Sequence, residues 1–161
     1  MTKGRVISTI LFLAVLSLTV LTACGGNASV SSVFPSKLVQ ANVAGDIVSI
    51  PLADVQENVN SKFTVGVNTY EISFMVYQFE GTIQVRADIC PPCRSESFTL
   101  DNDTLVCDTC GTVFKAGNGQ GVNGPCVKYP KAAVTHEVKD GNIIMNAGDL
   151  IKAYNETLER G

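Results

Sequence analysis

Short segments in which apolar and polar residues alternate dominate the chain after position 45, and a period of two is typical of β-strands. Four such segments are rich in β-branched and aromatic residues and are separated by turn residues: 46–50, 62–67, 70–77 and 82–89. No internal repeat occurs, and no helical period is found before the end of the chain. The pattern therefore predicts a mostly β domain.

Two hairpins and one helix complete the predicted elements. The hairpins cover 97–107 and 132–145, where Asp, Asn and Gly residues separate two apolar arms and tolerate the dihedral angles of tight turns. The segment 146–159 has helical spacing with Asn146 as its N-cap. We expect this helix to bury a stripe of apolar side chains, namely Leu150, Ile151, Tyr154 and Leu158.

The N-terminus has the composition of an export signal. Lys3 and Arg5 form a basic start, residues 6–20 are apolar and uncharged, and small residues precede Cys24. The apolar run is shorter than the ~20 residues that a membrane-spanning helix needs. A short apolar run followed by a small-residue cleavage site indicates a removed signal peptide at 1–23 rather than a retained anchor.

The letters LTAC at 21–24 resemble the bacterial lipobox, whose cysteine is diacylated and becomes the first residue of the mature chain. This resemblance implies that Cys24 anchors the protein to a bacterial membrane, with the domain outside the cytoplasm. Residues 25–37 are small, polar and nearly uncharged, which is typical of a flexible tether. We therefore expect three parts: a signal peptide at 1–23, a lipidated cysteine and tether at 24–42, and one domain at 43–161.

Loss of the signal peptide makes the protein more acidic. Lys3 and Arg5 are two of the twelve basic residues, so ten basic residues then face fifteen acidic ones, a net charge of −5. We expect no nucleic-acid partner, because nucleic acid is itself an anion. The chain has no glycine-rich phosphate loop and no G-x-S-x-G motif, and its one histidine, His136, lies in an alternating segment. We therefore do not expect a stand-alone catalyst.

Two Cys-x-x-Cys pairs carry the candidate chemistry. Cys90 and Cys93 follow a predicted strand, and Cys107 and Cys110 end a hairpin arm. Each tight loop can direct two side chains and several backbone N–H groups at one point, and Gly111 lets the backbone turn toward the sulfurs. Two pairs at this spacing predict a metal or cluster site with thiolate ligands.

Other uses of these thiols stay open at this point. Disulfides are common in small exported domains, although five cysteines follow Cys24, an odd number. A dithiol oxidoreductase usually carries one pair at the start of a helix, whereas neither pair here precedes a helical pattern. A closed zinc ribbon, which would stabilise a binding surface without redox chemistry, uses the same four-cysteine arrangement.

The order of parts resembles the Rieske iron–sulfur domain: a cysteine pair, a hairpin, a second pair followed by GTVF, then GQGVNGP and strands around EVKDGNIIM. Each Rieske knuckle offers one cysteine and one histidine, and Cys93 and Cys110 stand where the histidines are expected. The resemblance implies a Rieske-like fold of small sheets or a barrel, with two Cys-x-x-Cys knuckle loops and one C-terminal helix. The two cysteines at the histidine positions depart from the Rieske pattern and exclude ordinary Rieske ligation; an all-thiolate site has a lower potential than a histidine-ligated one.

The chain is also similar to the FtrD-like family of membrane iron–sulfur proteins, which are found beside bacterial iron-uptake permeases. The similarity covers about 46–145 and is carried by IPLADV, VRADICPPC, LVCDTCGTVF and NGPC. It implies an iron–sulfur cluster, electron transfer associated with iron uptake, and a membrane permease or redox protein as partner. Pro125 replaces a glycine of the family pattern. The cysteines that the family implies as metal ligands are Cys90, Cys93, Cys107, Cys110 and Cys126.

Overall fold

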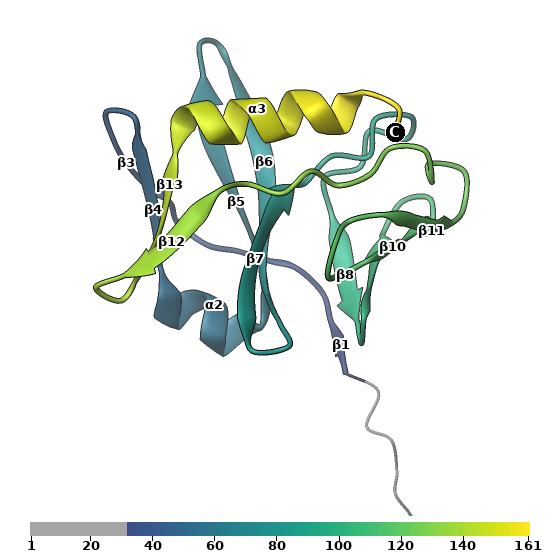
Figure 1. Cartoon of the computed structure of the whole chain (residues 1–161), viewed down its shortest axis with the longest axis horizontal. Coiled ribbons are helices and arrows are strands. Elements are labelled where there is room, and N and C mark those ends of the chain that lie inside the picture. Colours follow the sequence, from purple (N-terminus) through teal and green to yellow (C-terminus); the bar gives the residue numbers. More distant parts are fainter. Residues whose placement is uncertain (1–31) are drawn as a thin grey trace, which may run out of the picture. The chain divides into compact units, whose positions relative to one another are not determined.

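The computed structural model describes residues 32–161. The predicted signal peptide at 1–23 and the predicted lipid anchor Cys24 lie outside the described residues. The described residues form three β-sheets and two helices (Figure 1), so the mostly β prediction is confirmed. Neither of these two helices has the length and apolar content needed to cross a membrane.

The strands divide into a central sheet, a distal sheet and a cysteine sheet. The central sheet has the order β2 (Lys37–Leu38), β5 (Asn60–Val67), β6 (Tyr70–Phe79) and β7 (Thr82–Ala87). The distal sheet has the order β12 (His136–Lys139), β13 (Asn142–Asn146), β4 (Ile47–Pro51) and β3 (Asn42–Ala44). The cysteine sheet has the order β1 (Val33–Phe34), β8 (Phe98–Asp101), β9 (Thr104–Cys107), β10 (Val113–Lys115) and β11 (Gly121–Asn123).

Strand β6 separates two hydrophobic cores, because its side chains alternate between the two faces of the central sheet. Phe74 and Val76 belong to the first core, which the central sheet shares with the distal sheet and the C-terminal helix. Met75 and Tyr77 belong to the second core, which contains the buried cysteines of the cysteine sheet and its loops. The metal-binding candidates are therefore packed directly against the central sheet.

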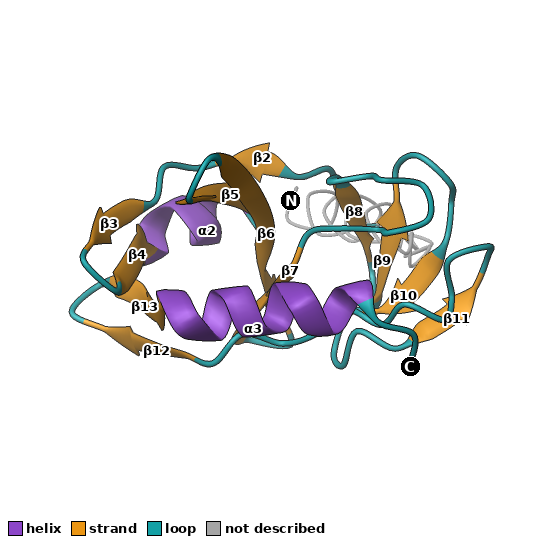
Figure 2. Ribbon diagram, turned by 90° about the horizontal axis from the view of Figure 1, so that it is seen from above, coloured by secondary structure: helices purple, strands orange, loops and turns teal. Residues whose placement is uncertain are grey.

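The C-terminal helix α3 (Ala147–Leu158) spans the domain from β13 toward the cysteine end (Figure 2). Asn146 caps it as predicted, since its Oδ1 accepts the N–H of Gly148 at 2.8 Å. The predicted buried stripe is wrong in part, because Ile151 and Leu158 are 38% and 43% exposed. The buried helix residues are instead Leu150, Ala153 and Thr157.

A packing constraint explains this difference. The hydroxyl of Thr157 accepts the N–H of Ala132 at 2.9 Å, so the segment that follows the cysteine loops lies against this side of α3. Small side chains let that backbone come close to the helix, whereas a large apolar side chain would keep it away. The apolar period of the sequence cannot show such a close approach.

Two more features of the fold differ from the sequence prediction. Helix α2 (Leu52–Asn58) was not predicted; it has seven residues and buries only Val55, which is too little to show a helical period.

Strands β1 and β2 lie before Val43, the predicted domain start, and pair with β8 and β5. The packed domain therefore begins earlier than predicted, and part of the predicted tether belongs to it. Asn60 fixes this early segment, because its side-chain NH₂ donates to the carbonyls of Phe34 and Phe98.

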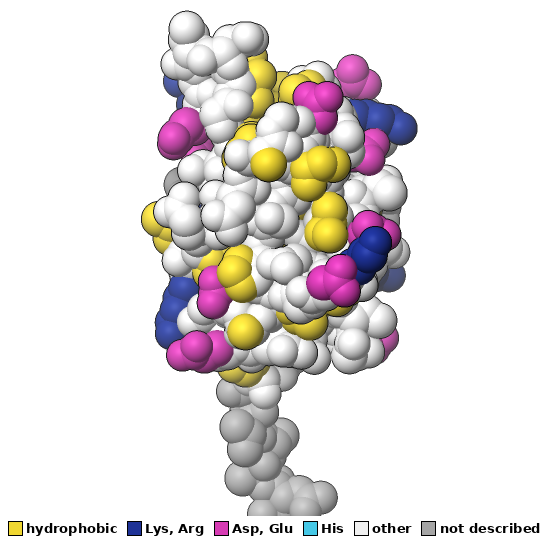
Figure 3. All heavy atoms as spheres, turned by 90° about the vertical axis from the view of Figure 1, so that its left-hand side faces the viewer, with side chains coloured by type: hydrophobic (Ala, Val, Ile, Leu, Met, Phe, Trp, Pro, Cys, Tyr) yellow, Lys and Arg dark blue, Asp and Glu magenta, His cyan; other side chains and the backbone are white. Residues whose placement is uncertain are grey.

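The distal end of the domain carries single apolar side chains among charged ones (Figure 3). Val43, Ile47 and Val138 are the large exposed apolar residues of β3, β4 and β12. Isolated apolar side chains are normal on a protein surface. The distal end therefore offers no large apolar surface for a partner among the described residues.

Candidate metal centre

Four cysteine sulfurs meet at the cysteine end of the domain. The Sγ atoms of Cys90, Cys93, Cys107 and Cys110 all lie within 4.8 Å of one another. The Cys93 and Cys107 sulfurs are 3.7 Å apart, and the Cys90 and Cys110 sulfurs 3.9 Å. In a tetrahedral site with metal–sulfur bonds of about 2.3 Å, the sulfurs are about 3.8 Å apart. The sequence prediction that the two knuckles face one another is confirmed, and the thiols are spaced as metal ligands.

Both knuckles are built by the same backbone turn. In the second knuckle the N–H of Gly111 donates to the carbonyl of Cys107 at 2.9 Å. In the first, the N–H of Arg94 donates to the carbonyl of Cys90 at 2.7 Å. Gly111 has a φ of 67° and Arg94 a φ of 57°, so both turns need the left-handed region. The predicted role of Gly111 is confirmed, because glycine reaches this region without steric cost.

The two cysteines of each knuckle differ in exposure. Cys90 and Cys107 are 0% and 1% exposed and belong to the second core. Cys93 and Cys110 are partly exposed at the surface of the same cluster. The four sulfurs therefore have a covered side and an accessible side.

The environment sets different proton affinities for these thiols. Burial raises the pKa of Cys90 and, to a smaller extent, of Cys107. Burial acts in the same direction on Cys110, but hydrogen bonds from the Thr112 side chain and backbone and from the neighbouring thiols outweigh it and lower its pKa to about 6. Cys110 therefore loses its proton more readily than an ordinary cysteine.

The fifth cysteine, Cys126, lies beside this group. Its side chain is buried, and its Sγ is 3.7 Å from that of Cys110. Thr112 joins the two, because its hydroxyl oxygen accepts the N–H of Cys126 at 3.1 Å and lies 3.1 Å from the sulfur of Cys110. Gly124, at a φ of 113°, permits this contact, since a Cβ there would lie 2.7 Å from the Cα of Thr112. Cys126 is thus a direct neighbour of the four sulfurs, and its role as a ligand stays a prediction.

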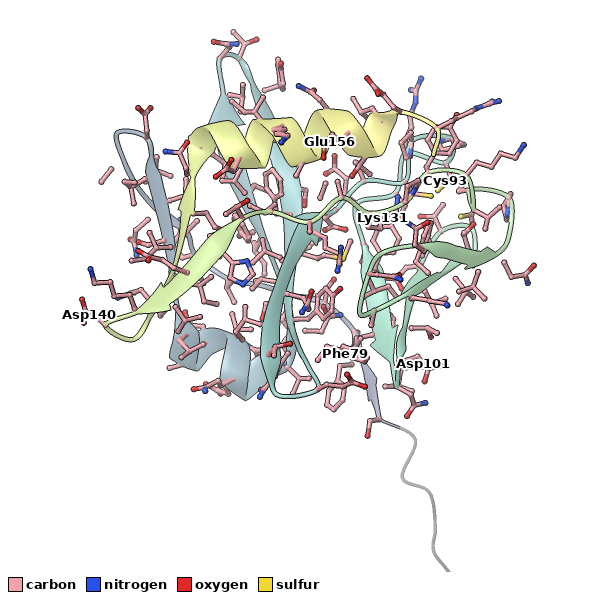
Figure 4. The ribbon with its side chains drawn as sticks, viewed as in Figure 1. Phe79, Cys93, Asp101, Lys131, Asp140 and Glu156 are labelled. Carbon is pink, nitrogen blue, oxygen red and sulfur yellow. The ribbon has the colours of Figure 1, made fainter. Side chains whose placement is uncertain are left out.

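Lys131 is a functional candidate that the sequence analysis missed. Its side chain is 1% exposed, and its Nζ donates to the carbonyl of Ile89 at 2.6 Å. The same Nζ lies 5.4 Å from the ring centroid of Phe98 and 4.6 Å from that of Phe114. Figure 4 shows Lys131 and Cys93 at the same end of the domain. No sequence signal reveals this burial, because lysine is normally a surface residue.

Arg86 connects the central sheet with the loops of the cysteine end. It is 3% exposed, and its guanidinium donates to the hydroxyl of Tyr77, the carbonyl of Lys131 and the carbonyl of Gly117 at 2.8–3.0 Å. The Tyr77 hydroxyl in turn donates to the carbonyl of Ala116 at 2.6 Å. These bonds hold the backbone around the metal centre in a fixed position on β6 and β7.

Asp88 is a buried carboxyl just before the first knuckle. Its Oδ2 accepts the hydroxyl of Ser73 at 3.1 Å, and its Oδ1 has no hydrogen-bond partner among the described residues. Burial raises the pKa of Asp88 to about 6, although the Ser73 hydrogen bond and the charge of Lys62 oppose the shift.

An open groove borders the first knuckle and the Cys126 loop. It has a volume of about 510 Å³ and includes Pro91 of the first knuckle, Pro125 of the Cys126 loop and the cationic side chains of Lys128 and Arg160. No carboxylate lines it among the described residues. The groove thus combines a position at the first knuckle and the Cys126 loop with a positive local charge.

His136, the histidine of the chain, takes no part in the centre. It lies in β12 of the distal sheet, and its Nδ1 is 2.9 Å from the carbonyl of Val134. The four sulfurs therefore have no histidine among them, as the sequence analysis expected.

Comparisons with known proteins agree with this arrangement. The model of the family described as membrane iron-sulfur containing protein FtrD-like matches residues 38–156. No curated protein matches the chain. A chain of the complex of reduced oxygenase and oxidized ferredoxin in carbazole 1,9a-dioxygenase is 20% identical, with a TM-score of 0.53 over 65% of this chain and 95% of its own. The Sphingomonas yanoikuyae B1 ferredoxin is 18% identical, with a TM-score of 0.44 over 53% of this chain and 83% of its own. The first similarity shows the fold and confirms the Rieske-like prediction.

Proposed function

Because the chain belongs to the FtrD-like family of membrane iron–sulfur containing proteins, we propose that it transfers electrons outside the cytoplasm in the service of iron acquisition. Its cofactor is an iron–sulfur cluster, and its general role is electron transfer. The observation that carries the proposal is the group of four cysteine sulfurs at the end of a Rieske-like domain.

The residues present fit such a cofactor. Cysteine thiolates are the usual ligands of iron–sulfur clusters, and Cys90, Cys93, Cys107 and Cys110 offer four of them at metal-ligand spacing. A bound cluster supplies the capacity to take up and release one electron. The protein holds it from the inside through Cys90 and Cys107, which the second core shields from water.

The remaining groups of the site prepare the ligands. The hydrogen bonds of Thr112 lower the pKa of Cys110, so this thiol gives up its proton to a metal more easily than an ordinary cysteine. Hydrogen bonds to ligand sulfurs also raise the reduction potential of iron–sulfur centres. With four thiolates and no histidine, we propose a potential below that of histidine-ligated Rieske centres.

We propose that Cys24 anchors the protein by lipid to a bacterial membrane, with the domain outside the cytoplasm. The LTAC letters and the apolar run before them support this proposal, and the family description places its members at the membrane. The link to iron uptake rests on the similarity in sequence to proteins found beside iron-uptake permeases.

For the partner, we propose a membrane permease or a redox protein with an acidic docking surface. The accessible sulfurs of Cys93 and Cys110 face the side from which electrons can leave. The groove beside them carries Lys128 and Arg160 without a lining carboxylate, so it attracts acidic groups although the whole protein is acidic.

Purification under anaerobic conditions tests the proposed function. We expect iron and acid-labile sulfide bound to the protein, together with visible absorption that bleaches on reduction and returns on oxidation. Cys107→Ser should lose most of the iron and the colour, whereas His136→Ala, altered in the distal sheet, should retain both. A colourless wild type with bound zinc would contradict electron transfer and favour the zinc ribbon.

A further inference from the structure

Lys131 presents a charge problem in the second core. Its ammonium group is buried between the rings of Phe98 and Phe114, and it has one hydrogen-bond acceptor among the described residues, the carbonyl of Ile89. It forms no salt bridge with any described carboxylate. A cation removed from water is unfavourable unless an anion balances it, and two aromatic rings supply only part of that balance.

The anionic groups around Lys131 belong mainly to the cysteine centre. Burial lowers the pKa of Lys131, and negative charge on Cys90, Cys107, Cys126 and Asp88 opposes this shift. Ile89, whose carbonyl accepts the lysine hydrogen bond, directly precedes Cys90. Metal-bound cysteines are thiolates, so cofactor binding provides the missing anions.

The backbone holds Lys131 in this position from two sides. Its N–H donates to the carbonyl of Gly119 at 2.9 Å, and its own carbonyl accepts from the guanidinium of Arg86 at 3.0 Å. Gly119 is packed so tightly there that a Cβ would lie 2.2 Å from the Lys131 carbonyl oxygen. The backbone of Lys131 is therefore fixed, and its ammonium group lies against Phe98 and Phe114 of the core that also contains Cys90 and Cys107.

We propose that Lys131 is the buried counter-cation of the cysteine centre and raises its reduction potential. The inference deepens the proposed function and depends on it, because it assigns a residue that tunes the proposed electron transfer. When one electron from a reduced partner enters the centre, the centre gains one negative charge and Lys131 keeps its proton. A fixed positive charge in a region of low dielectric stabilises this reduced form over the oxidised form.

Arg86 is not an equivalent candidate, although it is also a buried cation. Its guanidinium is engaged by the oxygens of Tyr77, Gln84, Gly117 and Lys131. It acts instead as a positioning residue that holds the Lys131 backbone.

Three substitutions separate the charge of Lys131 from its hydrogen bond to Ile89. Lys131→Met removes both, Lys131→Gln removes the charge but keeps an N–H donor, and Lys131→Arg keeps both. Lys115→Met is the matched control, because it removes one exposed positive charge from β10 of the cysteine sheet, where solvent and salt screen it. Iron content, circular dichroism and a redox titration are measured on each iron-loaded protein.

At a fixed ambient potential, Lys131→Met and Lys131→Gln should each lower the ratio of reduced to oxidised centre at least tenfold. For a one-electron couple this equals a midpoint about 59 mV lower. Lys131→Arg and Lys115→Met should stay within threefold of wild type. Folded Lys131→Met and Lys131→Gln proteins that do not retain iron, beside an iron-loaded Lys131→Arg, would also support a counter-cation.

Other outcomes would overturn the inference or the proposed function separately. If Lys131→Gln has the wild-type potential, the charge is irrelevant and Lys131 only satisfies the Ile89 carbonyl. If the wild type binds zinc and no iron, the proposed function fails alone. The counter-cation is then tested by zinc affinity, which should fall at least threefold in Lys131→Gln and stay unchanged in Lys115→Met; an unchanged affinity in both would refute it.

Discussion

Thr112→Val removes one hydroxyl and keeps the shape of the side chain, so it isolates the contact between the second knuckle and the Cys126 loop. Thr112 is 0% exposed, and its hydroxyl is the acceptor for the buried N–H of Cys126. In the variant a methyl group replaces this acceptor. Gly124 packs closely against Thr112, since a Cβ added at Gly124 would lie 2.7 Å from the Thr112 Cα, and this leaves little room for another partner.

The size of the effect follows from the unsatisfied donor. A buried N–H that loses its partner costs about 1–3 kcal/mol. Since about 1.4 kcal/mol corresponds to a tenfold change in an equilibrium, the local opening that exposes Cys126 should become about 5- to 150-fold more frequent. The pKa of Cys110 should also rise from about 6, because the Thr112 hydroxyl is among the groups that lower it.

Native-state hydrogen exchange on the metal-loaded protein measures this opening at the Cys126 amide. Thr64→Val on β5 is the control, because Thr64 is exposed and a surface substitution usually changes stability by less than about 0.5 kcal/mol. An exchange rate at Cys126 that is the same in Thr112→Val, Thr64→Val and wild type would show that the hydroxyl does not hold the loop.

Three further substitutions test other parts of the reasoning. Cys24→Ser should move the protein from the detergent phase to the aqueous phase in phase partition, because a hydroxyl cannot form the thioether to lipid; a wild type already in the aqueous phase would contradict the anchor. Cys126→Ser should lower metal occupancy or shift the absorption spectrum, but less than Cys107→Ser; an unchanged spectrum and a freely labelled Cys126 in wild type would make it a bystander. Asp88→Asn should stabilise the reduced, metal-free protein at pH 7 by up to about 3 kcal/mol. The pKa of Asp88 is raised in the folded wild type, so the folded state binds more protons than the unfolded state between about pH 4 and 6. The free energy of unfolding of the wild type should therefore fall as pH rises through this window. Equal pH dependence of variant and wild type in urea unfolding would refute the shift.

The sequence predicts the elements whose signals are local. Strand β7 (Thr82–Ala87) follows from the alternation in 82–89, although it ends two residues earlier than predicted. The cap of α3 follows from Asn146, and the facing knuckles from two Cys-x-x-Cys spacings, because a short loop largely determines its own geometry. The inward direction of Cys90 and Cys107 is not local, since it depends on the core that β6 and β10 build around them.

The features that the sequence could not predict depend on contacts between distant segments. Strands β1 and β2 have two residues each, too few for a period. Ala153 and Thr157 are buried because another backbone segment lies beside them, and nothing in their residue types indicates it. Lys131 is buried although lysine is normally a surface residue, and only the surrounding rings and thiols explain its burial.

The position of β6 between the two cores restricts how this protein can change. A single residue inserted within β6 would shift its register by one, and a shift by one exchanges the faces of all following side chains. Phe74 and Val76 would then point at the thiols, and Met75 and Tyr77 would enter the opposite core. The insertion or deletion of a single residue within Tyr70–Phe79 would therefore disrupt both cores, whereas the turn at Glu80–Gly81 can accept such a change. A designer who wishes to graft this centre onto another scaffold must carry β6 with it, in register.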